Sequence, residues 1–375
     1  MPVPRRVIIS VVSDLVTDQR VHRTALALHS KGLIVTLVGR KLRSSLSMPD
    51  RPYQTKRFNL GIETGPLFYA FYNIRLFFFL LFSKADILVT NDLDTLLPNF
   101  IISRLKKSEL FYDSHEYFTE VPELVSRPRI QKIWLTIEKF IFPKLKNVYT
   151  VNESIAAIYS KKYKVPVQVV RNLPFRPSEK SNKIRREDVG LPVDKKIFLF
   201  QGAGINVDRG AEEAIEAIAE NENAALLFIG GGDVFKQLKE KVRSLKIEDK
   251  VFFIPKQPME ILYQYTSLAD FGLTLDKDTN LNYRFSLPNK LFDYIQAGLP
   301  VLASDLPEVR KIVEHYNIGK ITPSTSVADI AATMKQMISD AQQLALWKEN
   351  LKIAAADLCW ENEEKKLMQI FKDVI

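Results

Sequence analysis

Near its start the chain reads Val7-Ile8-Ile9-Ser10-Val11-Val12, a nearly unbroken apolar run whose length predicts a buried strand. A polar loop follows at 13–19, and apolar side chains then recur at helical spacing within residues 21–28. Gly32 is placed to end that helix, and the apolar run 34–38 predicts the next strand. A strand, a helix and a second strand in this order predict a βαβ unit with parallel strands.

The same alternation continues through the chain and predicts two parallel sheets. Further strands are expected at 87–90, 110–112, 148–151, 196–200, 225–229, 251–254, 271–275 and 300–303. Helical patterns lie between these runs, and we find no tandem repeat of fixed period. The segment 171–192 lacks sustained periodicity and holds three prolines, so it is predicted to separate two domains of the same kind.

The composition is that of an ordinary globular protein. With 375 residues the chain can form two domains, and its 46% hydrophobic and 26% charged residues argue against disorder. The single cysteine, Cys359, excludes a disulfide framework or a cysteine-based metal site and fits a reducing compartment. The first apolar run is too short for a signal-peptide core and no small-residue cleavage site follows it, so we expect a cytoplasmic protein.

The net charge of +9 is spread unevenly along the chain. Residues 1–186 carry 31 Lys and Arg against 15 Asp and Glu, whereas residues 187–375 carry 22 against 29. The first half is therefore strongly basic, which suits an anionic partner such as nucleic acid, an acidic membrane surface or a phosphate-bearing substrate. Charge that serves only solubility would give the same count.

The segment 67–82 is rich in aromatic residues and has Arg75 as its only charge. Its 16 residues fall short of a comfortable membrane span. We expect a buried helix that packs on the first sheet. The alternative is a helix that also dips into a membrane surface, which the basic first half would support.

Two glycine-containing turns follow predicted strands in the second half. Phe200-Gln201-Gly202-Ala203-Gly204 ends one strand, and Arg209-Gly210 precedes a helix. Such a turn offers backbone N–H groups and a favourable dipole to a phosphate, and Arg209 would add a bidentate charge. Ile229-Gly230-Gly231-Gly232-Asp233 repeats the arrangement, where the glycines could equally admit a ligand or let a helix pack closely.

The most informative segment is Ser286-Leu287-Pro288-Asn289-Lys290-Leu291-Phe292-Asp293-Tyr294-Ile295-Gln296-Ala297-Gly298-Leu299-Pro300-Val301. Pro288 is well placed to open a helix. Lys290 then lies in the first turn, where it opposes the helix dipole, and an anion held between the lysine and the helix end would explain its presence. Asp293, one turn further on the same face, could bind a ribose diol or pair with Lys290 on the surface.

This segment resembles the donor-site signature of bacterial glycosyltransferases of family four, the group 1 type, which have the GT-B fold. The matching residues are Pro288 to Tyr294 and Ala297 to Val301. Other stretches resemble the family in the order it requires. They are Asp14 with Asp18-Gln19-Arg20-Val21, Asn91-Asp92-Leu93-Asp94-Thr95-Leu96, Tyr112-Asp113-Ser114-His115-Glu116, Arg171-Asn172-Leu173-Pro174 and Trp360-Glu361. The resemblance covers nearly the whole chain but does not specify the sugar.

The resemblance implies an α/β protein of GT-B architecture, with two Rossmann-like βαβ domains that face a central cleft. It implies an N-terminal acceptor domain at 1–172, a linker at 173–192, a C-terminal nucleotide-sugar donor domain at 193–350, and a C-terminal helix at 351–375 that crosses back toward the first domain.

It also implies roles for single residues. The expected donor-binding residues are Gly202, Gly204, Arg209, Gly230, Lys256, Asn289, Lys290 and Asp293. Among them Arg209 and Lys290 would neutralise the diphosphate, Asp293 would hold the ribose, and backbone near Lys256 would meet the base. The expected catalytic residues are His115, against the transferred sugar, and Glu116, which orients it. The expected acceptor-binding residues are Asp14, Asp18, Arg20, Asp92 and Asp94.

Some of these residues have simpler interpretations. A lone histidine after a strand is usually structural, although the position of His115 between Asp113 and Glu116 favours a functional role. Asp92 and Asp94 could instead cap the helix that follows. The sequence also departs from the family, because many members carry two acidic residues eight positions apart and the first would fall on Phe285.

The implied reaction is transfer of a sugar from a nucleotide-diphosphate sugar to a glycan or lipid-linked acceptor, with retention of configuration, no cofactor and no required metal. The basic first half suggests assembly of a bacterial surface polysaccharide at the inner face of the membrane, with an anionic membrane surface as a further partner and no nucleic acid.

Three other functions compete with this interpretation. An NAD(P)-dependent oxidoreductase would share the Rossmann-like halves, but neither first turn reads Gly-x-Gly-x-x-Gly with an acidic residue further on. A nucleic-acid-binding protein would interleave aromatic residues with Lys and Arg, whereas here the aromatic residues gather in an apolar run. The third is a catalytically silent relative, which Phe285 at the expected acidic position keeps open.

Overall fold

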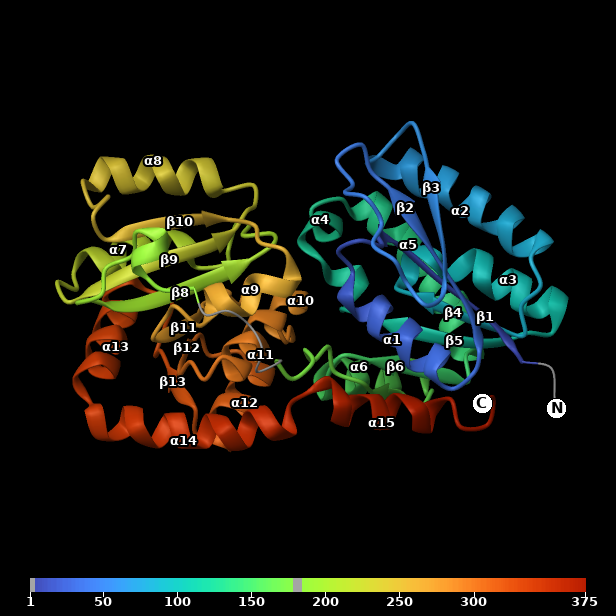
Figure 1. Cartoon of the computed structure of the whole chain (residues 1–375). Helices are drawn as coiled ribbons and strands as arrows, with labels where there is room; N and C mark the ends of the chain where they lie inside the picture. Colours follow the sequence, from blue (N-terminus) through green and yellow to red (C-terminus); the bar gives the residue numbers. More distant parts are fainter. Residues whose placement is uncertain (1–3, 178–183) are drawn as a thin grey trace. The chain divides into compact units, whose positions relative to one another are not determined.

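The computed structural model describes residues 4–177 and 184–375, so 178–183 of the predicted linker lie outside the described residues. The chain divides into two compact units (Figure 1). The first unit comprises Met1–Asn172 together with Glu363–Ile375, and the second comprises Leu173–Asn362. Each unit is described by itself below.

The first unit is built on a seven-stranded parallel sheet with the strand order β3-β2-β1-β4-β5-β6-β7. Its strands are β1 (Arg6–Asp14), β2 (Ile34–Lys41), β3 (Gln54–Asn59), β4 (Ile87–Asn91), β5 (Glu109–Ser114), β6 (Asn147–Thr150) and β7 (Gln168–Val169). Its helices are α1 (Gln19–Ser30), α2 (Gly65–Phe82), α3 (Leu96–Lys106), α4 (Pro122–Val125), α5 (Pro128–Ile141) and α6 (Glu153–Tyr163), with short 3-10 turns η1 (Leu93–Thr95), η2 (Phe118–Glu120) and η3 (Phe142–Lys144).

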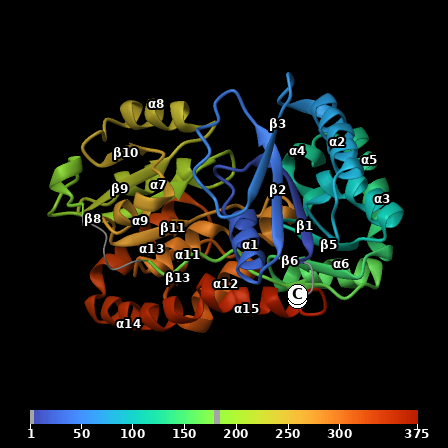
Figure 2. The ribbon, with the colours of Figure 1, turned by 45° about the vertical axis from the view of Figure 1, so that its right-hand side comes forward.

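Helices cover both faces of this sheet. Figures 1 and 2 show α1 on one face and α2, α3 and α5 on the other. Successive side chains of β5 point to opposite faces of the sheet, so neighbouring residues contact the helical layers on its two sides. Phe111 stacks on Phe371 from the C-terminal segment, with ring centroids 4.0 Å apart, whereas Tyr112 meets Phe142, which directly follows α5. The final residues of the chain therefore complete the core of the first unit, as the fold class predicts.

The second unit repeats the plan with a six-stranded parallel sheet, β10-β9-β8-β11-β12-β13. Its strands are β8 (Lys196–Gly202), β9 (Ala224–Gly230), β10 (Val251–Pro255), β11 (Phe271–Thr274), β12 (Val301–Ala303) and β13 (Gly319–Ile321). Its helical segments are η4 (Glu187–Val189), α7 (Ala211–Ala219), α8 (Phe235–Leu245), α9 (Met259–Thr266), α10 (Leu281–Arg284), α11 (Asn289–Gln296), α12 (Pro307–Tyr316), α13 (Val327–Ser339), α14 (Ala341–Asp357) and the first turn of α15 (Trp360–Ile370). A separate apolar cluster fills each face of the sheet, so the strands are buried on both sides.

Every predicted strand is present, but three short or polar strands escape the periodicity analysis. β3 reads Gln-Thr-Lys-Arg-Phe-Asn because it is an edge strand whose side chains are largely exposed, and β7 and β13 contain two and three residues. The prediction for 67–82 needs a correction. This segment forms α2, but only one face of the helix is buried, because α2 covers the outside of the sheet instead of lying between two layers.

Glycines at the carboxyl ends of β8 and β9 allow the backbones of these two strands to touch. Gly230 has φ +136°, and a Cβ there would lie 1.8 Å from the carbonyl oxygen of Gly202. The neighbouring Gly231 donates its N–H to that same carbonyl at 3.2 Å and accepts from the N–H of Ile205 at 2.8 Å. The close neighbour of Gly230 is thus the end of β8 and not a helix, so the contact differs from both interpretations of the Gly230 turn.

We predict that Gly230→Ala destabilises the second unit by roughly 2 kcal/mol or more, because the substitution meets both a positive φ and a backbone clash. Gly231→Ala is the matched control, since a Cβ at Gly231 would meet no atom within 4 Å. Urea unfolding of both variants measures the difference, and equal losses of stability would contradict the packing argument.

Candidate functional site

In each unit the strand order fixes where a ligand can approach. The chain moves outward through β2 and β3, then returns to place β4 on the other side of β1, and the second unit does the same with β9, β10 and β11 around β8. At such a reversal the connections leave neighbouring strands toward opposite faces, which opens a crevice beyond their carboxyl ends. The two candidate sites are therefore the turns after β1 and β4 and the turns after β8 and β11.

The turns after β8 and β11 meet through three charged side chains. The guanidinium of Arg209, between β8 and α7, lies 2.8 Å from Oδ1 of Asp276, which follows β11. Nζ of Lys290, in the first turn of α11, lies 3.5 Å from the other carboxylate oxygen, Oδ2. Asp276 is fully buried, and aromatic rings support both cations: Tyr283 lies 4.1 Å from the guanidinium of Arg209 and Phe200 lies 4.5 Å from Nζ of Lys290.

This cluster carries a net positive charge, because two cations share one carboxylate. Burial alone would raise the pKa of Asp276, but Lys290 and Arg209 hold it below its ordinary value. The pKa of Lys290 is lowered, first by burial and also by repulsion from Arg209, although Asp276 opposes this change. Asp276 therefore does not neutralise both positive charges. An anion bound at this position would be stabilised by Arg209 and by Lys290.

Asp293 lies one turn along α11 from Lys290 but is not its salt-bridge partner. Oδ2 of Asp293 accepts a hydrogen bond from Nε2 of Gln201 at 3.0 Å, and Thr266 donates to Oε1 of Gln201 at 2.6 Å. Lys290 instead pairs with Asp276. The surface pair considered for Lys290 and Asp293 is therefore replaced by two separate partners.

The other predicted donor residues occupy the same edge of the second sheet. Asn289 begins α11, Gly202 ends β8 and Gly230 ends β9, while Gly204 and Lys256 lie on exposed loops after β8 and β10. The contacts of the charged cluster do not extend to Lys256 among the residues that the structure describes. Phe285, at the departure from the family pattern, is a half-buried residue that ends α10.

In the first unit, His115 is held by carboxylates on both sides. Nδ1 of His115 lies 3.3 Å from Asp92 Oδ2, and Nε2 lies 3.3 Å from Asp113 Oδ2 and 3.1 Å from Asn91 Oδ1. The backbone N–H of His115 also donates to Asp92 at 2.7 Å. Burial of the imidazole would lower the pKa of His115, but Asp92 and Asp113 raise it to about 9. His115 is therefore a cation and a hydrogen-bond donor at neutral pH, and not a base.

Arg20 was expected to bind the acceptor, but its side chain is buried against Asp113. It is only 4% exposed, and its guanidinium donates through Nε and Nη2 to both oxygens of Asp113, at 2.9 and 2.5 Å, and through Nη1 to the carbonyl of Val170 at 2.9 Å. This buried bidentate pair orients Asp113. Arg20 thus reaches His115 only through that carboxylate, which makes it a supporting residue in this structure.

The predicted acidic residues of the first unit divide by role. Asp18 caps α1 by accepting from Val21 N–H at 3.2 Å, and Asp14 accepts from Ser45 at 2.6 Å. The capping alternative for Asp92 and Asp94 is wrong, because neither side chain makes a cap hydrogen bond to η1 or α3.

Asp94 and Glu116 are the remaining predicted site residues of the first unit. The charges of His115 and Glu116 both act on the carboxyl group of Asp94. Oδ1 of Asp94 is buried without a hydrogen-bond partner among the described residues, and burial followed by the charge of Asp92 raises the pKa of Asp94 well above its ordinary value. A buried carboxyl group with an unused oxygen at a strand end is a candidate ligand contact. Glu116 is half-buried, and its carbonyl accepts from Ser114 Oγ at 2.9 Å.

Sequence reasoning missed the roles of Asp113 and Asp276, the two carboxylates that organise these groups. Both are fully buried acidic residues at or just beyond the carboxyl end of a predicted strand. An acidic residue directly after a buried apolar run needs a cationic partner. That signal was present in the sequence at both positions.

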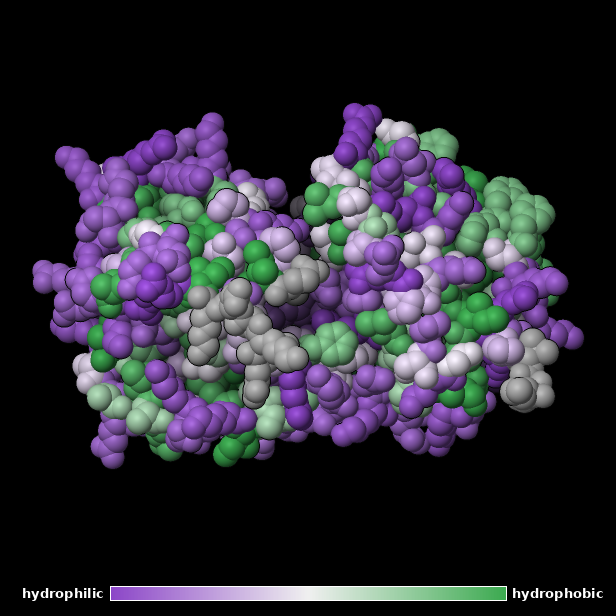
Figure 3. Space-filling model, in the orientation of Figure 1, coloured by the Kyte–Doolittle hydropathy of each residue, from purple (hydrophilic) through white to green (hydrophobic). Residues whose placement is uncertain are grey.

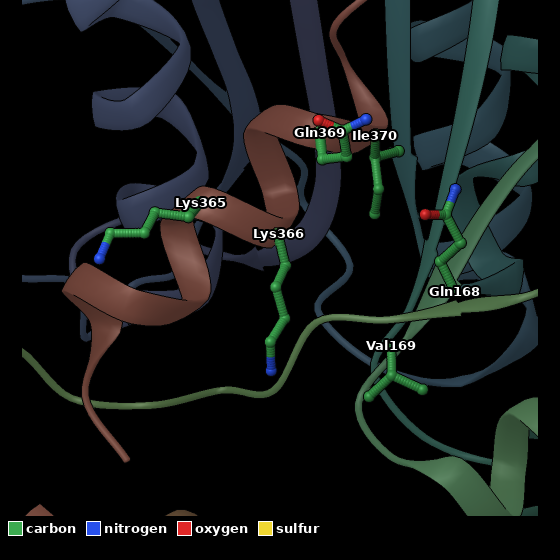
Figure 4. A pocket seen from close by; sticks show the side chains of 6 residues that line it. All are labelled: Gln168, Val169, Lys365, Lys366, Gln369 and Ile370. Atoms are coloured by element: carbon green, nitrogen blue, oxygen red, sulfur yellow. The ribbon is translucent and has the colours of Figure 1, made fainter. Parts of the chain in front are cut away.

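A cavity of about 510 Å³ elsewhere in the first unit does not coincide with either group. Its lining residues are Gln168, Val169, Lys365, Lys366, Gln369 and Ile370. Figure 4 shows the side chains of Lys365 and Lys366 extending in different directions, so they do not converge on one ligand. Lys366 is also paired with Glu363 at 3.0 Å. Among the described residues, no group of three or more His, Cys, Asp or Glu is placed to hold a metal ion.

We predict that Asp276→Asn lowers the free energy of unfolding by about 3 kcal/mol, because it removes a fully buried carboxylate and leaves two partly buried cations without their shared partner. The control is Asp305→Asn, which removes an exposed ion pair with Arg310 and is expected to cost less than about 1 kcal/mol. Chemical denaturation measures both losses, and a loss for Asp276→Asn as small as that of the control would contradict the anchoring role.

We also predict that His115 makes stability depend on pH. The imidazole titrates near 6.5 in the unfolded chain and at about 9 in the fold, so its stabilisation is complete below pH 6.5 and is lost as the pH rises through 9. His115→Gln should remove roughly 2 to 3 kcal/mol of this pH-dependent stability. The control is His315→Gln, at an exposed position. Unfolding at several pH values tests the prediction, and parallel pH profiles for wild type and His115→Gln would contradict it.

Part of the chain matches a known protein family and curated relatives. Residues 181–353 match the family described as Glycosyl transferases group 1. Over 163 residues the chain is 24% identical to N-acetyl-alpha-D-glucosaminyl L-malate synthase of Bacillus anthracis and 26% identical to the amylovoran biosynthesis glycosyltransferase AmsK of Erwinia amylovora. These matches cover 42% of this chain and 40% and 39% of the relatives, so the chain spans about two fifths of the curated relatives it matches.

Solved structures resemble the chain over nearly its whole length. Sucrose-phosphate synthase from Thermosynechococcus elongatus superposes with a TM-score of 0.78 at 16% identity, covering 99% of both chains. WaaG, a glycosyltransferase involved in lipopolysaccharide biosynthesis, gives 0.73 at 17% identity over 97% of this chain and 99% of its own. Anabaena Alr3699/HepE in complex with UDP and glucose gives 0.72 at 14% identity over 99% and 100%. The glycosyl transferases group 1 match covers most of the second unit, and over its whole length the chain has the GT-B fold of these solved structures.

Proposed function

We propose that this protein transfers a sugar from a nucleotide-diphosphate sugar to a glycan or lipid-linked acceptor, with retention of configuration and without a required metal. The observation that carries the proposal is the partly buried cluster of Arg209, Asp276 and Lys290, which has a net positive charge and lies at the strand reversal of the unit that matches the group 1 family. A diphosphate is the anion that such a donor presents at this edge of a Rossmann-like sheet.

Each donor contact follows from the chemistry of the second unit. Arg209 and Lys290 bind the diphosphate, and Asp276 keeps both cations in place as a positioning residue. Asp293, already fixed by Gln201, has further acceptor capacity for a ribose hydroxyl. The exposed loops that carry Gly204 and Lys256 are where the base and the outer donor contacts are proposed.

In the first unit we assign His115 to the transferred sugar. As a cation held by Asp92 and Asp113, it donates hydrogen bonds to sugar hydroxyls and stabilises negative charge, but it does not abstract a proton. Asp94, with its raised pKa and unused oxygen, is proposed to bind an acceptor hydroxyl. Asp14 and Glu116 complete the proposed polar lining, while Asp18 and Arg20 support it from behind.

The proposed reaction needs no enzymic nucleophile. The bond between the anomeric carbon and the donor phosphate oxygen breaks, and the acceptor oxygen bonds to that carbon on the same face, so the configuration is retained. The acceptor proton passes to the departing diphosphate, whose negative charge grows as the bond breaks. Arg209 and Lys290 stabilise that charge, which is the work that a metal ion performs in other diphosphate sites.

We further propose that the protein acts in the cytoplasm, at the inner face of the membrane, in assembly of a bacterial surface polysaccharide. Two similar proteins support this pathway by their descriptions, AmsK in amylovoran biosynthesis and WaaG in lipopolysaccharide biosynthesis. The basic first half suits an acceptor carried on an anionic lipid.

We predict that one nucleoside diphosphate among UDP, GDP and ADP, tested with their sugar conjugates in a screen that also includes the monophosphate CMP, raises the unfolding temperature of the protein. Binding to the folded state at a hundredfold excess over Kd adds about 2.7 kcal/mol of stability by mass action. Lys290→Ala and Arg209→Ala should abolish the shift, whereas Lys236→Ala, an exposed lysine of the same unit, should preserve it.

NAD and NADP serve as ligand controls in the same thermal-shift experiment. A shift with NAD or NADP alone would replace the proposal by an oxidoreductase. A shift with one sugar nucleotide, without release of its nucleoside diphosphate when candidate acceptors are added, would indicate a silent relative. A shift that survives Lys290→Ala would overturn the assigned donor site.

A further inference from the structure

Helix α2 exposes one row of large apolar side chains along its whole length. The row, called here the α2 stripe, consists of Leu67, Phe71, Ile74, Phe78 and Phe82. Spacings of three and four residues place these side chains on one side of an α-helix. Phe82 is 83% exposed, and Figure 3 shows hydrophobic side chains gathered on the surface over α2. A contiguous exposed apolar row of this kind marks an interaction surface.

The opposite face of α2 is fixed in the core of the first unit. Its buried residues are Phe68, Tyr72, Leu76 and Leu80, which cluster with apolar residues of β1, β2 and β4. The hydroxyl of Tyr72 donates to the carbonyl of Val11 at 2.6 Å. By length and composition α2 could cross a membrane, but it would have to withdraw this face from the core to do so. We therefore consider a surface on which α2 lies.

Helices α3 and α5 extend the apolar surface. α2 packs on α3, α3 packs on α5, and Figure 2 shows the three helices together on one face of the sheet. Leu105 of α3 and Ile133 and Phe140 of α5 are exposed. Phe140 lies edge-on to Phe100 of α3, with ring centroids 6.4 Å apart. The α2 stripe is thus one part of a broader exposed apolar face.

The exposed charges on the three helices themselves have one sign, since Arg75, Arg104, Arg129, Lys132 and Lys139 are exposed there. The flanking segments add the exposed cations Lys84, Lys107, Lys144 and Lys146 and the exposed acidic residues Asp86, Glu109 and Glu123. Within α2, α3 and α5, which the structure describes throughout, the only acidic side chain is Glu138, and it is buried against Lys162 and Tyr163. Long lysine and arginine side chains can cover apolar surface while their charges reach outward.

We propose that the face formed by α2, α3 and α5 docks on the surface of a bilayer that contains anionic lipids. The α2 stripe enters the boundary between headgroups and acyl chains, and the surrounding cations contact the negative headgroups. A bilayer surface satisfies both features at once, because it offers apolar depth beneath negative charge. Docking does not require the transfer reaction proposed above, although it would bring a lipid-linked acceptor to the first unit.

A second copy of this chain is the competing occupant, and the charges disfavour it. Two such faces in contact would bring basic rims together without exposed carboxylates on these helices to compensate them. A neutral bilayer would lack the partner for those cations. Anionic lipid is therefore the occupant that the face fits.

The test is flotation of the full chain with vesicles of phosphatidylcholine, with or without phosphatidylglycerol, in the absence of nucleotide. We predict that wild type floats with the anionic vesicles, and that Phe71→Ser with Phe78→Ser weakens binding by about tenfold or more. The matched control is Leu346→Ser with Ile353→Ser, an exposed apolar pair with the same seven-residue spacing on α14. This control should bind like wild type.

A charge variant tests the second feature independently. Lys132→Gln, Lys139→Gln and Lys146→Gln together should weaken binding to anionic vesicles by about a hundredfold, whereas Lys236→Gln, Lys335→Gln and Lys348→Gln, exposed in the second unit, should have little effect. Unchanged thermal unfolding and an unchanged nucleotide-induced shift show that a variant is folded. These readouts also separate a failure of docking from a failure of the proposed transferase function.

Three outcomes would overturn the proposal. The first is equal binding to neutral and anionic vesicles, and the second is binding that survives both sets of substitutions. The third is a stable dimer, measured by light scattering without lipid, that Phe71→Ser with Phe78→Ser dissociates, because that result would assign the face to a second copy.

Discussion

Parallel strand order is the constraint on which both candidate sites depend. When all strands of a sheet run the same way, every turn from a strand into a helix emerges at one edge. Where the chain reverses across the sheet, at β1 and β4 and again at β8 and β11, the turns diverge and leave room for a ligand. The buried carboxylates Asp113 and Asp276 lie at this edge of their sheets, and each fixes the cations around it.

The two sites differ in their balance of charge. In the first unit, two cationic groups, Arg20 and His115, face two carboxylates, Asp92 and Asp113, so these four charges sum to zero. In the second unit, Arg209 and Lys290 face only Asp276. A balanced network can hold a neutral, hydroxyl-rich group by hydrogen bonds, whereas an excess of positive charge suits a diphosphate.

The sequence predicted the fold more completely than it predicted contacts. Long buried strands such as β1 and β8 show unbroken apolar runs, whereas the edge strand β3 is polar and gives no such signal. The first turn of α11 was predicted because Pro288 is well placed to open a helix. Lys290 drew attention because a lysine in the first turn opposes the helix dipole. The partner of Lys290 could not be predicted, because Asp276 follows β11 whereas Lys290 lies on α11, and only the packing of α11 against the sheet brings the two together. The placement of Arg20 against Asp113 depends on the same kind of long-range contact.

Helix α2 has apolar residues both on its buried face and on its exposed face. Its sequence is apolar on every side, so periodicity alone could not distinguish a helix buried all round from a helix with one face in the core. The structure separates the faces: Tyr72 and its neighbours are tied to the sheet, and the α2 stripe is left outside it. Exposed phenylalanines would favour aggregation in water. Lysine and arginine side chains around the α2 stripe oppose self-association, and the proposed docking on anionic lipid would account for both the charge of the first half and the apolar character of α2.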